Sequence, residues 1–192
     1  IGGNVAENSG GVHCLKYGLT VHNVTRVRGV TIDGEVLEFG SEALDTPGLD
    51  LLAVLIGSEG MLAVVTEVTV KLVPSPELAQ VVMASFDDVK QAGDAVARII
   101  AEGIIPAGLE MMDQKTSRAV EPFVNAGYDL DAQAILLAES DGTPEEVAEE
   151  IARIESVLRA SGATATKVSA SEAERLRFWS GRKNAFPAAG RI

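Results

Sequence analysis

Two short glycine-bearing segments hold residues whose types and spacing could do chemistry. The first is IGGNVAENSGG at residues 1–11, which combines four glycines with two asparagines, and the second is GSEG at residues 57–60. Glycine permits positive φ and lets a ligand approach the backbone closely, while small polar side chains add hydrogen-bonding groups. Each segment is as typical of a plain surface loop as of a loop that contacts an anion or a cofactor. Two such loops framing one sheet-rich region favour a shared ligand.

The first segment is not the dinucleotide-binding fingerprint of a strand, a tight turn and a helix. The spacing of Gly2, Gly3, Gly10 and Gly11 does not give the required pattern, and no helix is expected to follow it. We therefore expect a loop here, and any cofactor contact has to come from a different kind of site.

A third candidate lies near the other end of the sequence, in RFWSGRK. Arg182 is one helical turn from Phe178 and Trp179, so its guanidinium could be held against aromatic walls and bind a carboxylate through two parallel hydrogen bonds. The alternative is a cation that stabilises the C-terminus of its own helix. The residues by themselves leave both interpretations open.

The remaining residues that could do chemistry are expected to have structural roles. The chain has one cysteine, Cys14, which permits no internal disulfide and lacks an activating motif, so we expect a small core residue. Its two histidines, His13 and His22, argue against a zinc site within the chain, and each is expected to be a structural or surface residue. The acid and the two methionines of EMMD (110–113) are expected to pack in a core.

Composition excludes several classes of protein. The 192 residues are 46% hydrophobic and 23% charged, which is ordinary for a globular chain, and the formal charge of -12 argues against binding to nucleic acid. No apolar run is long enough for a membrane span and no signal segment is present, so a cytoplasmic location is expected. Because the sequence begins inside a glycine-rich segment and stops at AFPAAGRI without a polar tail, we expect a fragment of a longer protein.

The first part of the chain is strand-rich. Residues 24–40 are expected to form a hairpin with a type I′ turn at Asp33-Gly34, and AVVTEVTVKLV (63–73) is expected to form a strand. Residues 50–56 could be either helix or strand. The two prolines of PSPE (74–77) end the strand, and we expect a domain boundary there.

After that boundary strands and helices alternate. Capping boxes at Thr143 with Glu146 and at Ser171 with Glu174 start two of the helices, and Gly162 is expected to end the first of these. Strands joined by short connections to helices predict an α+β fold in which a small sheet is covered by helices, close to a ferredoxin-like sandwich.

Four stretches together carry a resemblance over the whole chain: IGGNVAENSGGVHCLKYGLTVHNV, LDLLAVLIGSEGMLAVVTEVTVKLVP, GIIPAGLEMMD and ERLRFWSGRKNAFPAAGRI. They resemble the FAD-linked glycolate oxidases, which belong to the vanillyl-alcohol-oxidase-type flavoproteins together with FAD-dependent D-lactate and D-2-hydroxyglutarate dehydrogenases. The resemblance implies that residues 1–75 are the C-terminal portion of a PCMH-type FAD-binding domain. Residues 76–192 would then be part of the cap domain that contacts the substrate.

The resemblance also implies a set of site residues. In the family, the two glycine-bearing segments run along FAD, and backbone N–H groups rather than cations are expected to face its pyrophosphate. The FAD contacts carried over are Gly2, Gly3, Asn4, Asn8, Ser9, Gly11, Gly18, Glu59, Gly60 and Val64. Ala63 departs from the family, which usually has glycine there. Arg182 matches the arginine that binds the substrate carboxylate, whereas the catalytic histidine and the metal ligands would follow Ile192.

The activity implied is the FAD-dependent oxidation of a small 2-hydroxy acid, in the first place glycolate to glyoxylate. The implied partners are a second flavoprotein subunit and a subunit with iron-sulphur clusters, with possible association to the inner face of a membrane through them, and the fragment alone is expected to be inactive. One alternative is a dehydrogenase of D-lactate or another D-2-hydroxy acid. Another, from a different class, is a non-catalytic ferredoxin-like binding module whose glycines are simply turns.

Overall fold

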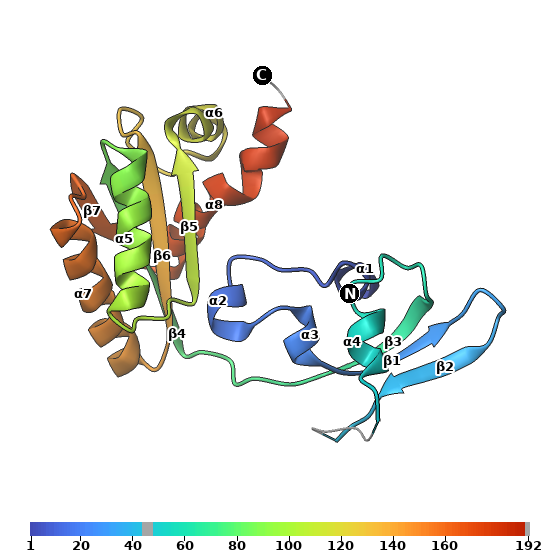
Figure 1. Cartoon of the computed structure of the whole chain (residues 1–192). Coiled ribbons are helices and arrows are strands. Elements are labelled where there is room, and N and C mark those ends of the chain that lie inside the picture. The colour runs from blue at the N-terminus through green and yellow to red at the C-terminus, as the bar shows by residue number, and fades with distance from the viewer. Residues whose placement is uncertain (44–47, 191–192) are drawn as a thin grey trace. The chain divides into compact units, whose positions relative to one another are not determined.

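The computed structural model describes residues 1–43 and 48–190 (Figure 1). The chain divides into two compact units, Ile1–Pro74 and Ser75–Ile192, so the break falls within the PSPE segment. Each unit has its own sheet and its own core. Within the described part of the chain, no helix combines the length and the apolarity needed to cross a membrane.

The first unit is a three-stranded antiparallel sheet with short helices. Its elements in chain order are α1 (Gly2–Glu7), α2 (Cys14–Tyr17), α3 (Thr20–Asn23), β1 (Val24–Val30), β2 (Val36–Gly40), α4 (Leu51–Leu55) and β3 (Val64–Val70). The strand order is β2-β1-β3. A small core joins α1 and α4 to the sheet, and its buried members are Val5, Val24, Val27, Leu55, Ile56 and Ala63.

The β1–β2 hairpin forms as expected, but its turn is of another type. The N–H of Gly34 donates to the Thr31 carbonyl, and the N–H of Thr31 donates to the Glu35 carbonyl. Gly34 has φ +80° whereas Asp33 is not among the residues with positive φ. A type I′ turn needs positive φ at both central residues, so the connection is a three-residue loop with a glycine bulge.

The ambiguous segment at residues 50–56 is helical. Asp50 is the N-cap of α4, and its Oδ1 accepts a hydrogen bond from the N–H of Ala53 at 3.0 Å. A side-chain cap satisfies one of the backbone donors that a helix leaves unpaired at its start. The buried side chain of Leu55 then fixes the helix on the core.

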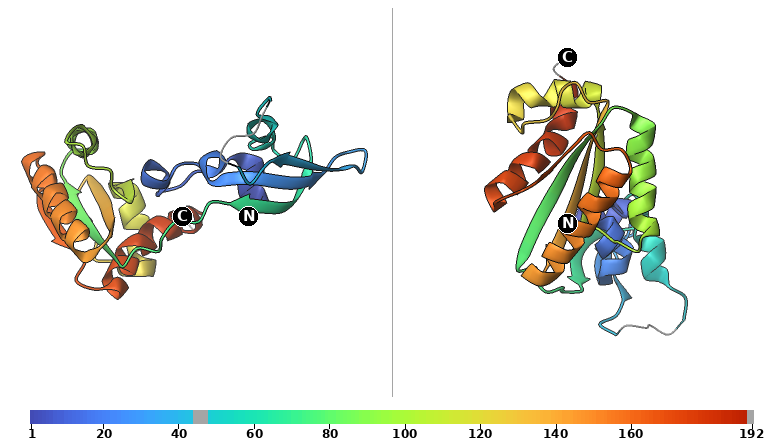
Figure 2. Two further views of the ribbon diagram at one scale, coloured as in Figure 1. Left: turned by 90° about the horizontal axis from the view of Figure 1, so that it is seen from below. Right: turned by 90° about the vertical axis from the view of Figure 1, so that its left-hand side faces the viewer.

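The second unit has the α+β fold expected from the sequence. Its elements are β4 (Leu78–Phe86), α5 (Val89–Ala101), β5 (Gly108–Asp113), α6 (Gln114–Val124), β6 (Ala134–Gly142), α7 (Pro144–Ala160), β7 (Ala165–Val168) and α8 (Glu172–Ala189). The four strands are antiparallel in the order β5-β6-β4-β7, which is the order of a ferredoxin-like βαββαβ sheet. Helices α5 and α7 cover one face, and α6 and α8 cover the other (Figure 2).

Strand periodicity explains how both faces come to be covered. Alternate residues of β4 and β6, such as Ala84 and Leu136, join the buried stripes of α5 and α7 in one core. Their neighbours point to the opposite face, where Leu137 and Glu139 are also buried. Both central strands are therefore largely apolar rather than alternating.

The capping boxes differ from each other in the structure. Thr143 and Glu146 form the full reciprocal box at the start of α7. At α8 the Ser171 hydroxyl accepts from the N–H of Glu174, but the Glu174 carboxylate accepts from the N–H of Ala170. The second box is thus half formed, because the acid bonds one residue upstream of the N-cap.

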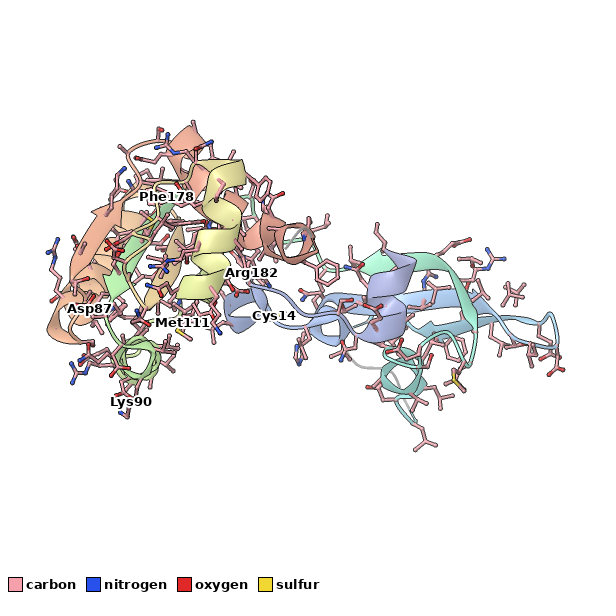
Figure 3. All side chains as sticks on the ribbon, turned by 90° about the horizontal axis from the view of Figure 1, so that it is seen from above. Cys14, Asp87, Lys90, Met111, Phe178 and Arg182 are labelled. Atoms are coloured by element: carbon pink, nitrogen blue, oxygen red, sulfur yellow. The ribbon has the colours of Figure 1, made fainter. Side chains whose placement is uncertain are left out.

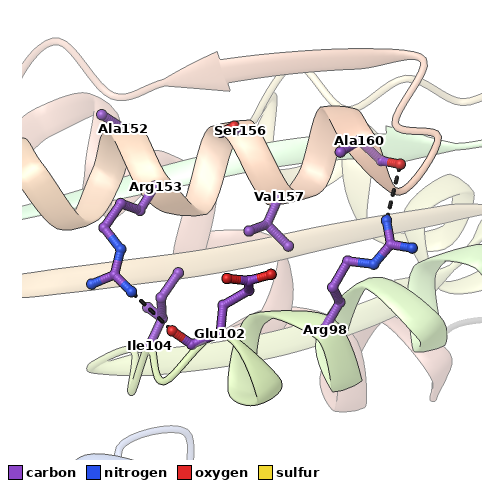
Figure 4. Close-up of a pocket in the computed structure, with 8 residues that line it drawn as sticks. All are labelled: Arg98, Glu102, Ile104, Ala152, Arg153, Ser156, Val157 and Ala160. Carbon is purple, nitrogen blue, oxygen red and sulfur yellow. Dashed lines mark hydrogen bonds between the residues drawn. The ribbon is translucent and has the colours of Figure 1, made fainter.

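Two arginines link α5 and α7, and each reaches a carbonyl at the C-terminal end of the other helix (Figure 4). Arg98 of α5 donates to the Ala160 carbonyl at 3.1 Å, and Arg153 of α7 donates to the Glu102 carbonyl at 2.9 Å. Each guanidinium thus satisfies a carbonyl at the end of the other helix, where a cation also meets the negative end of the helix dipole. We call these two hydrogen bonds the arginine clamp. The depression between the helices, which Ile104 and Val157 help to line, is explained by this clamp.

Replacing either clamp arginine should lower the stability of the second unit slightly. We expect Arg98→Gln and Arg153→Gln each to cost about 0.5–1 kcal/mol, because each removes an exposed charged hydrogen bond to a helix end. Urea denaturation followed by the fluorescence of Trp179 would measure this. Lys90→Gln, which removes the cation of an exposed pair with Asp94, is the control and should leave the midpoint unchanged. Equal midpoints for all three variants would contradict the clamp.

Candidate functional site

The first glycine-bearing segment forms a short helix rather than the expected loop. Helix α1 ends at Asn8, which has φ +50° and whose side-chain Oδ1 accepts a hydrogen bond from the N–H of Val21 at 3.0 Å. Glycine is a poor helix former, so six residues of this composition are not helical by propensity. Tertiary contacts supply the stability instead, above all the burial of Val5 at 1% exposure.

The second glycine-bearing segment is hydrogen-bonded to the end of α1. The N–H of Gly57 donates to the Val5 carbonyl at 2.9 Å, and the N–H of Glu59 donates to the Ala6 carbonyl at 2.8 Å. Gly57, Glu59 and Gly60 have φ values of +83°, +54° and +74°. Left-handed backbone is unusual for glutamate and costs free energy, which marks this exposed turn as a candidate for function. We call α1 with Asn8, Ser9 and the turn at 57–60 the glycine cluster.

A cavity of about 250 Å³ adjoins the glycine cluster. Three of the expected FAD contacts line it, namely Asn4, Ser9 and Gly18, together with apolar residues of β3 such as Val68. Gly18 has φ +78°, and a Cβ there would lie 2.8 Å from Nδ1 of His22. That nitrogen accepts a hydrogen bond from the N–H of Leu19 at 3.0 Å, so His22 has a structural role.

The other expected FAD contacts of the first unit are placed as follows. Gly2 lies beside Val65 of β3, and Val64 begins that strand with 68% of its surface exposed. At Gly3, Gly11 and Gly60, a Cβ would point into open space. The Cα side of these three glycines is therefore open to a ligand.

Many of the backbone donors expected to face the FAD pyrophosphate are already in use. The N–H groups of Asn8, Ser9, Gly11, Gly18 and Glu59 donate to acceptors within the chain. The acceptor for Gly11 is Sγ of Cys14 at 2.8 Å, so this half-buried cysteine orders the segment instead of filling a core. Ligand contacts at the cluster must therefore come mainly from side-chain amides and hydroxyls and from the open glycines.

These observations fit part of an FAD molecule and not the whole of it. The open glycines and the uncharged polar side chains suit a dinucleotide lying against the backbone. The cavity is smaller than the roughly 300–1,000 Å³ of ordinary small-molecule sites. The glycine cluster by itself therefore offers no more than one wall to a ligand of that size.

In the second unit, Arg182 lies on α8 and pairs with Glu110 of β5. Its Nε is 3.0 Å from Oε2 of Glu110, and the two side chains are 44% and 22% exposed. Phe178 and Trp179, the aromatic walls expected beside it, are buried at 0% and 4% exposure, and the label of Phe178 stands apart from that of Arg182 in Figure 3. The cation over the Phe178 ring is Lys167, at 5.4 Å from the centroid.

Helix α8 is fixed to the sheet by a buried acid that sequence reasoning missed. Glu139 of β6 is 2% exposed, and its Oε2 accepts from Nη1 of Arg175 at 2.6 Å and from Nε1 of Trp179 at 2.5 Å. Arg175 also binds Glu172, and the two carboxylates raise the pKa of Arg175. A buried charge needs such partners to offset its desolvation.

A second buried contact explains the glycine of the WSGRK motif. The Tyr128 hydroxyl donates to the Phe178 carbonyl, and a Cβ at Gly181 would overlap the tyrosine ring and hydroxyl. Burial raises the pKa of Tyr128, so the hydroxyl stays protonated and keeps donating. Glycine at 181 thus lets α8 approach Tyr128 closely, one residue before Arg182.

The sequence held a weak signal for Glu110 and almost none for Tyr128. Glu110 stands between apolar neighbours in a predicted strand, on the same face as Gly108 and Met112, so an acid partnered by a cation could have been inferred. Of the EMMD residues, Met112 is in the core as expected, whereas Met111 is exposed. Over residues 1–43 and 48–190, no group of three or more His, Cys, Asp or Glu residues is arranged to hold a metal ion.

Comparisons with known proteins match both units. The profile of the family described as "FAD linked oxidases, C-terminal domain" matches residues 75–192, and that of the "FAD binding domain" matches residues 1–40. Glycolate oxidase subunit GlcD of Escherichia coli strain K12 is 62% identical over the whole chain. D-Lactate dehydrogenase of Anaerostipes hadrus is 32% identical over 79% of it.

The chain spans 38% of the length of the first of these relatives and 33% of the second. Among solved structures, alkyldihydroxyacetonephosphate synthase matches 97% of this chain with a TM-score of 0.70, at 20% identity and over 37% of that protein. At this identity the likeness supports the fold alone.

Proposed function

Because the chain belongs to the FAD-linked oxidases, we propose that it is part of an enzyme that oxidises a small 2-hydroxy acid with FAD, in the first place glycolate to glyoxylate. The observation that carries the choice of glycolate is the 62% identity over the whole chain to a subunit named for glycolate oxidase. Residues 1–75 would belong to the FAD-binding domain and residues 76–192 to the cap domain.

The residues proposed to hold FAD are those of the glycine cluster and its surroundings. Asn4, Ser9 and Gly18 line the cavity, Gly3, Gly11 and Gly60 expose backbone, and Gly2, Asn8, Glu59 and Val64 complete the set. FAD, when bound, supplies the acceptor for the substrate hydride. The protein's own part is to bind and orient both reactants and to exclude water.

Arg182 is proposed to bind the substrate carboxylate. Its side chain is exposed and its Nε lies beside Glu110. The two Nη groups, at the other end of the guanidinium, would then bind the substrate. Glycolate has little besides a carboxylate and a hydroxyl by which an enzyme can hold it. A planar guanidinium that donates two parallel hydrogen bonds gives such a substrate a defined orientation.

The partners and the cellular location remain part of the proposal. The relative from Escherichia coli is named as a subunit, which supports assembly into a complex. We propose that this complex includes a second flavoprotein and an iron-sulphur subunit that take the electrons onward, and that it lies in the cytoplasm. Purification of the tagged complete protein and analysis of the chains that accompany it would test this.

D-Lactate is the alternative substrate, favoured by the 32% identity to a D-lactate dehydrogenase. Glycolate and D-lactate share the carboxylate that Arg182 would bind and differ by one methyl group. Steady-state kinetics of the full-length protein with both acids would separate them. A higher kcat/KM for D-lactate would replace glycolate in the proposal, and flavin-free protein that oxidises neither acid would favour a binding module.

The 192-residue chain alone should bind FAD weakly. The glycine cluster provides one wall of a site, so most of the cofactor would stay in solvent while its ordering still costs entropy. Titration of the chain with FAD, followed by flavin fluorescence, is expected to give a Kd above about 10 µM. Sub-micromolar binding would show instead that the described residues suffice. Asn4→Ala should weaken whatever binding is seen, whereas Glu77→Ala, in the segment between the units, should not.

A further inference from the structure

We propose that Glu110 is a positioning residue for substrate binding, which acts by pairing with the Nε end of the Arg182 guanidinium and leaving both Nη groups to the substrate carboxylate. The inference rests on the proposed function of Arg182 and adds a residue to it. Glu110 itself is not expected to touch the substrate.

The geometry of the ion pair carries this assignment. A guanidinium has five N–H donors, one on Nε and four on the two Nη atoms. Glu110 contacts the Nε through Oε2 at 3.0 Å. A carboxylate that binds end-on uses one N–H from each Nη, and that pair of donors points away from Nε. The Glu110 ion pair and an end-on substrate therefore involve different nitrogens of the same guanidinium.

Both members of the pair stand on well-supported elements. Glu110 is in β5, where it faces Leu137 in the register with the central strand β6. Arg182 follows directly after Gly181 on α8, which Glu139 and Tyr128 hold to the rest of the unit. Rigid support of this kind lets one ion pair fix the direction of a flexible side chain before the substrate arrives.

The negative charge of Glu110 has a separate effect, which decides the direction of the KM change expected for each variant. A carboxylate beside Arg182 offsets part of the positive charge that attracts an anionic substrate. Glutamine at this position keeps an oxygen that can accept from Nε and removes the negative charge. Orientation and attraction can therefore be varied one at a time.

The test is steady-state kinetics on the full-length flavin-loaded protein with glycolate and with D-lactate. Glu110→Ala should raise KM about tenfold and change kcat by less than about threefold, because the guanidinium loses its orientation but not its contact with the substrate. Glu110→Gln should keep KM at or below the wild-type value. The effect of Glu110→Ala should nearly vanish when Arg182 is already lysine, because a residue that acts through another is not additive with it.

The flavin content and the thermal unfolding midpoint of the full-length protein provide the structural control. Both should be the same in the two Glu110 variants as in the wild type, which shows that the variants fold normally. An unchanged KM in Glu110→Ala, or a loss of kcat in Glu110→Gln of about a hundredfold, would overturn the inference. A flavin-loaded protein that oxidises neither acid would overturn the proposed function instead, so the two failures are distinguishable.

Discussion

Glu139→Ala should destabilise the second unit by about 2–3 kcal/mol, the largest loss of stability expected from a single polar substitution described for this chain. The change leaves the indole N–H of Trp179 without its acceptor and leaves Arg175 with one carboxylate, Glu172, in place of two. Arg175 is 18% exposed and keeps the Glu172 pair, so the loss is smaller than for a fully isolated buried charge.

Urea denaturation followed at the emission of Trp179 would measure this loss, because that fluorophore reports on the second unit alone. The emission of the folded variant should also shift to the red as α8 loosens. Glu139→Gln retains one acceptor and should lose about half as much. Glu172→Gln removes the exposed partner of the same arginine and should cost no more than about 0.5 kcal/mol. Equal losses for the Glu139 and Glu172 variants would show that the buried acid does not hold the helix.

The helices and strands of the second unit could be predicted from the sequence because the patterns that indicate them lie within short stretches of it. Helix α7, for example, has a complete capping box at Thr143 and a regular buried stripe, and the structure shows both. The contacts that place α8 could not be read in this way. Glu139 and Trp179 are 40 residues apart, and Tyr128 and Phe178 are 50 apart, so no window of sequence shows them together. Only the pairing of distant segments in the fold creates these interactions.

The glycine-bearing segments illustrate a different limit. Local propensity predicts a loop at residues 1–11, yet α1 forms there, because Val5 is buried and its carbonyl accepts from Gly57. A shared ligand for the two segments was expected from their composition and the resemblance, but the use of their N–H groups within the chain was not. Hydrogen bonds between segments decide which backbone groups remain for a ligand, and composition says nothing about that.

Arg182→Lys in the full-length flavin-loaded protein should reduce kcat/KM for glycolate by a factor of about 30 or more, which corresponds to about 2 kcal/mol. The physical reason is geometric. Lysine keeps the charge, but a single ammonium group cannot donate two parallel hydrogen bonds to one carboxylate while also meeting Glu110. Charge alone should therefore not restore the activity, and the same loss is expected with D-lactate because both substrates present the same carboxylate.

The flavin content and the thermal unfolding midpoint of this variant should match those of the wild type, because the Arg182 side chain is 44% exposed and takes no part in the buried contacts of α8. Lys183→Gln removes the neighbouring exposed cation on the same helix, so it separates a general loss of positive charge from a loss of the guanidinium fork. We expect kcat/KM of Lys183→Gln to stay within about twofold of wild type. If Arg182→Lys also stays near the wild-type value, or if it loses flavin and unfolds early, Arg182 is a structural cation of α8 and the carboxylate is bound elsewhere.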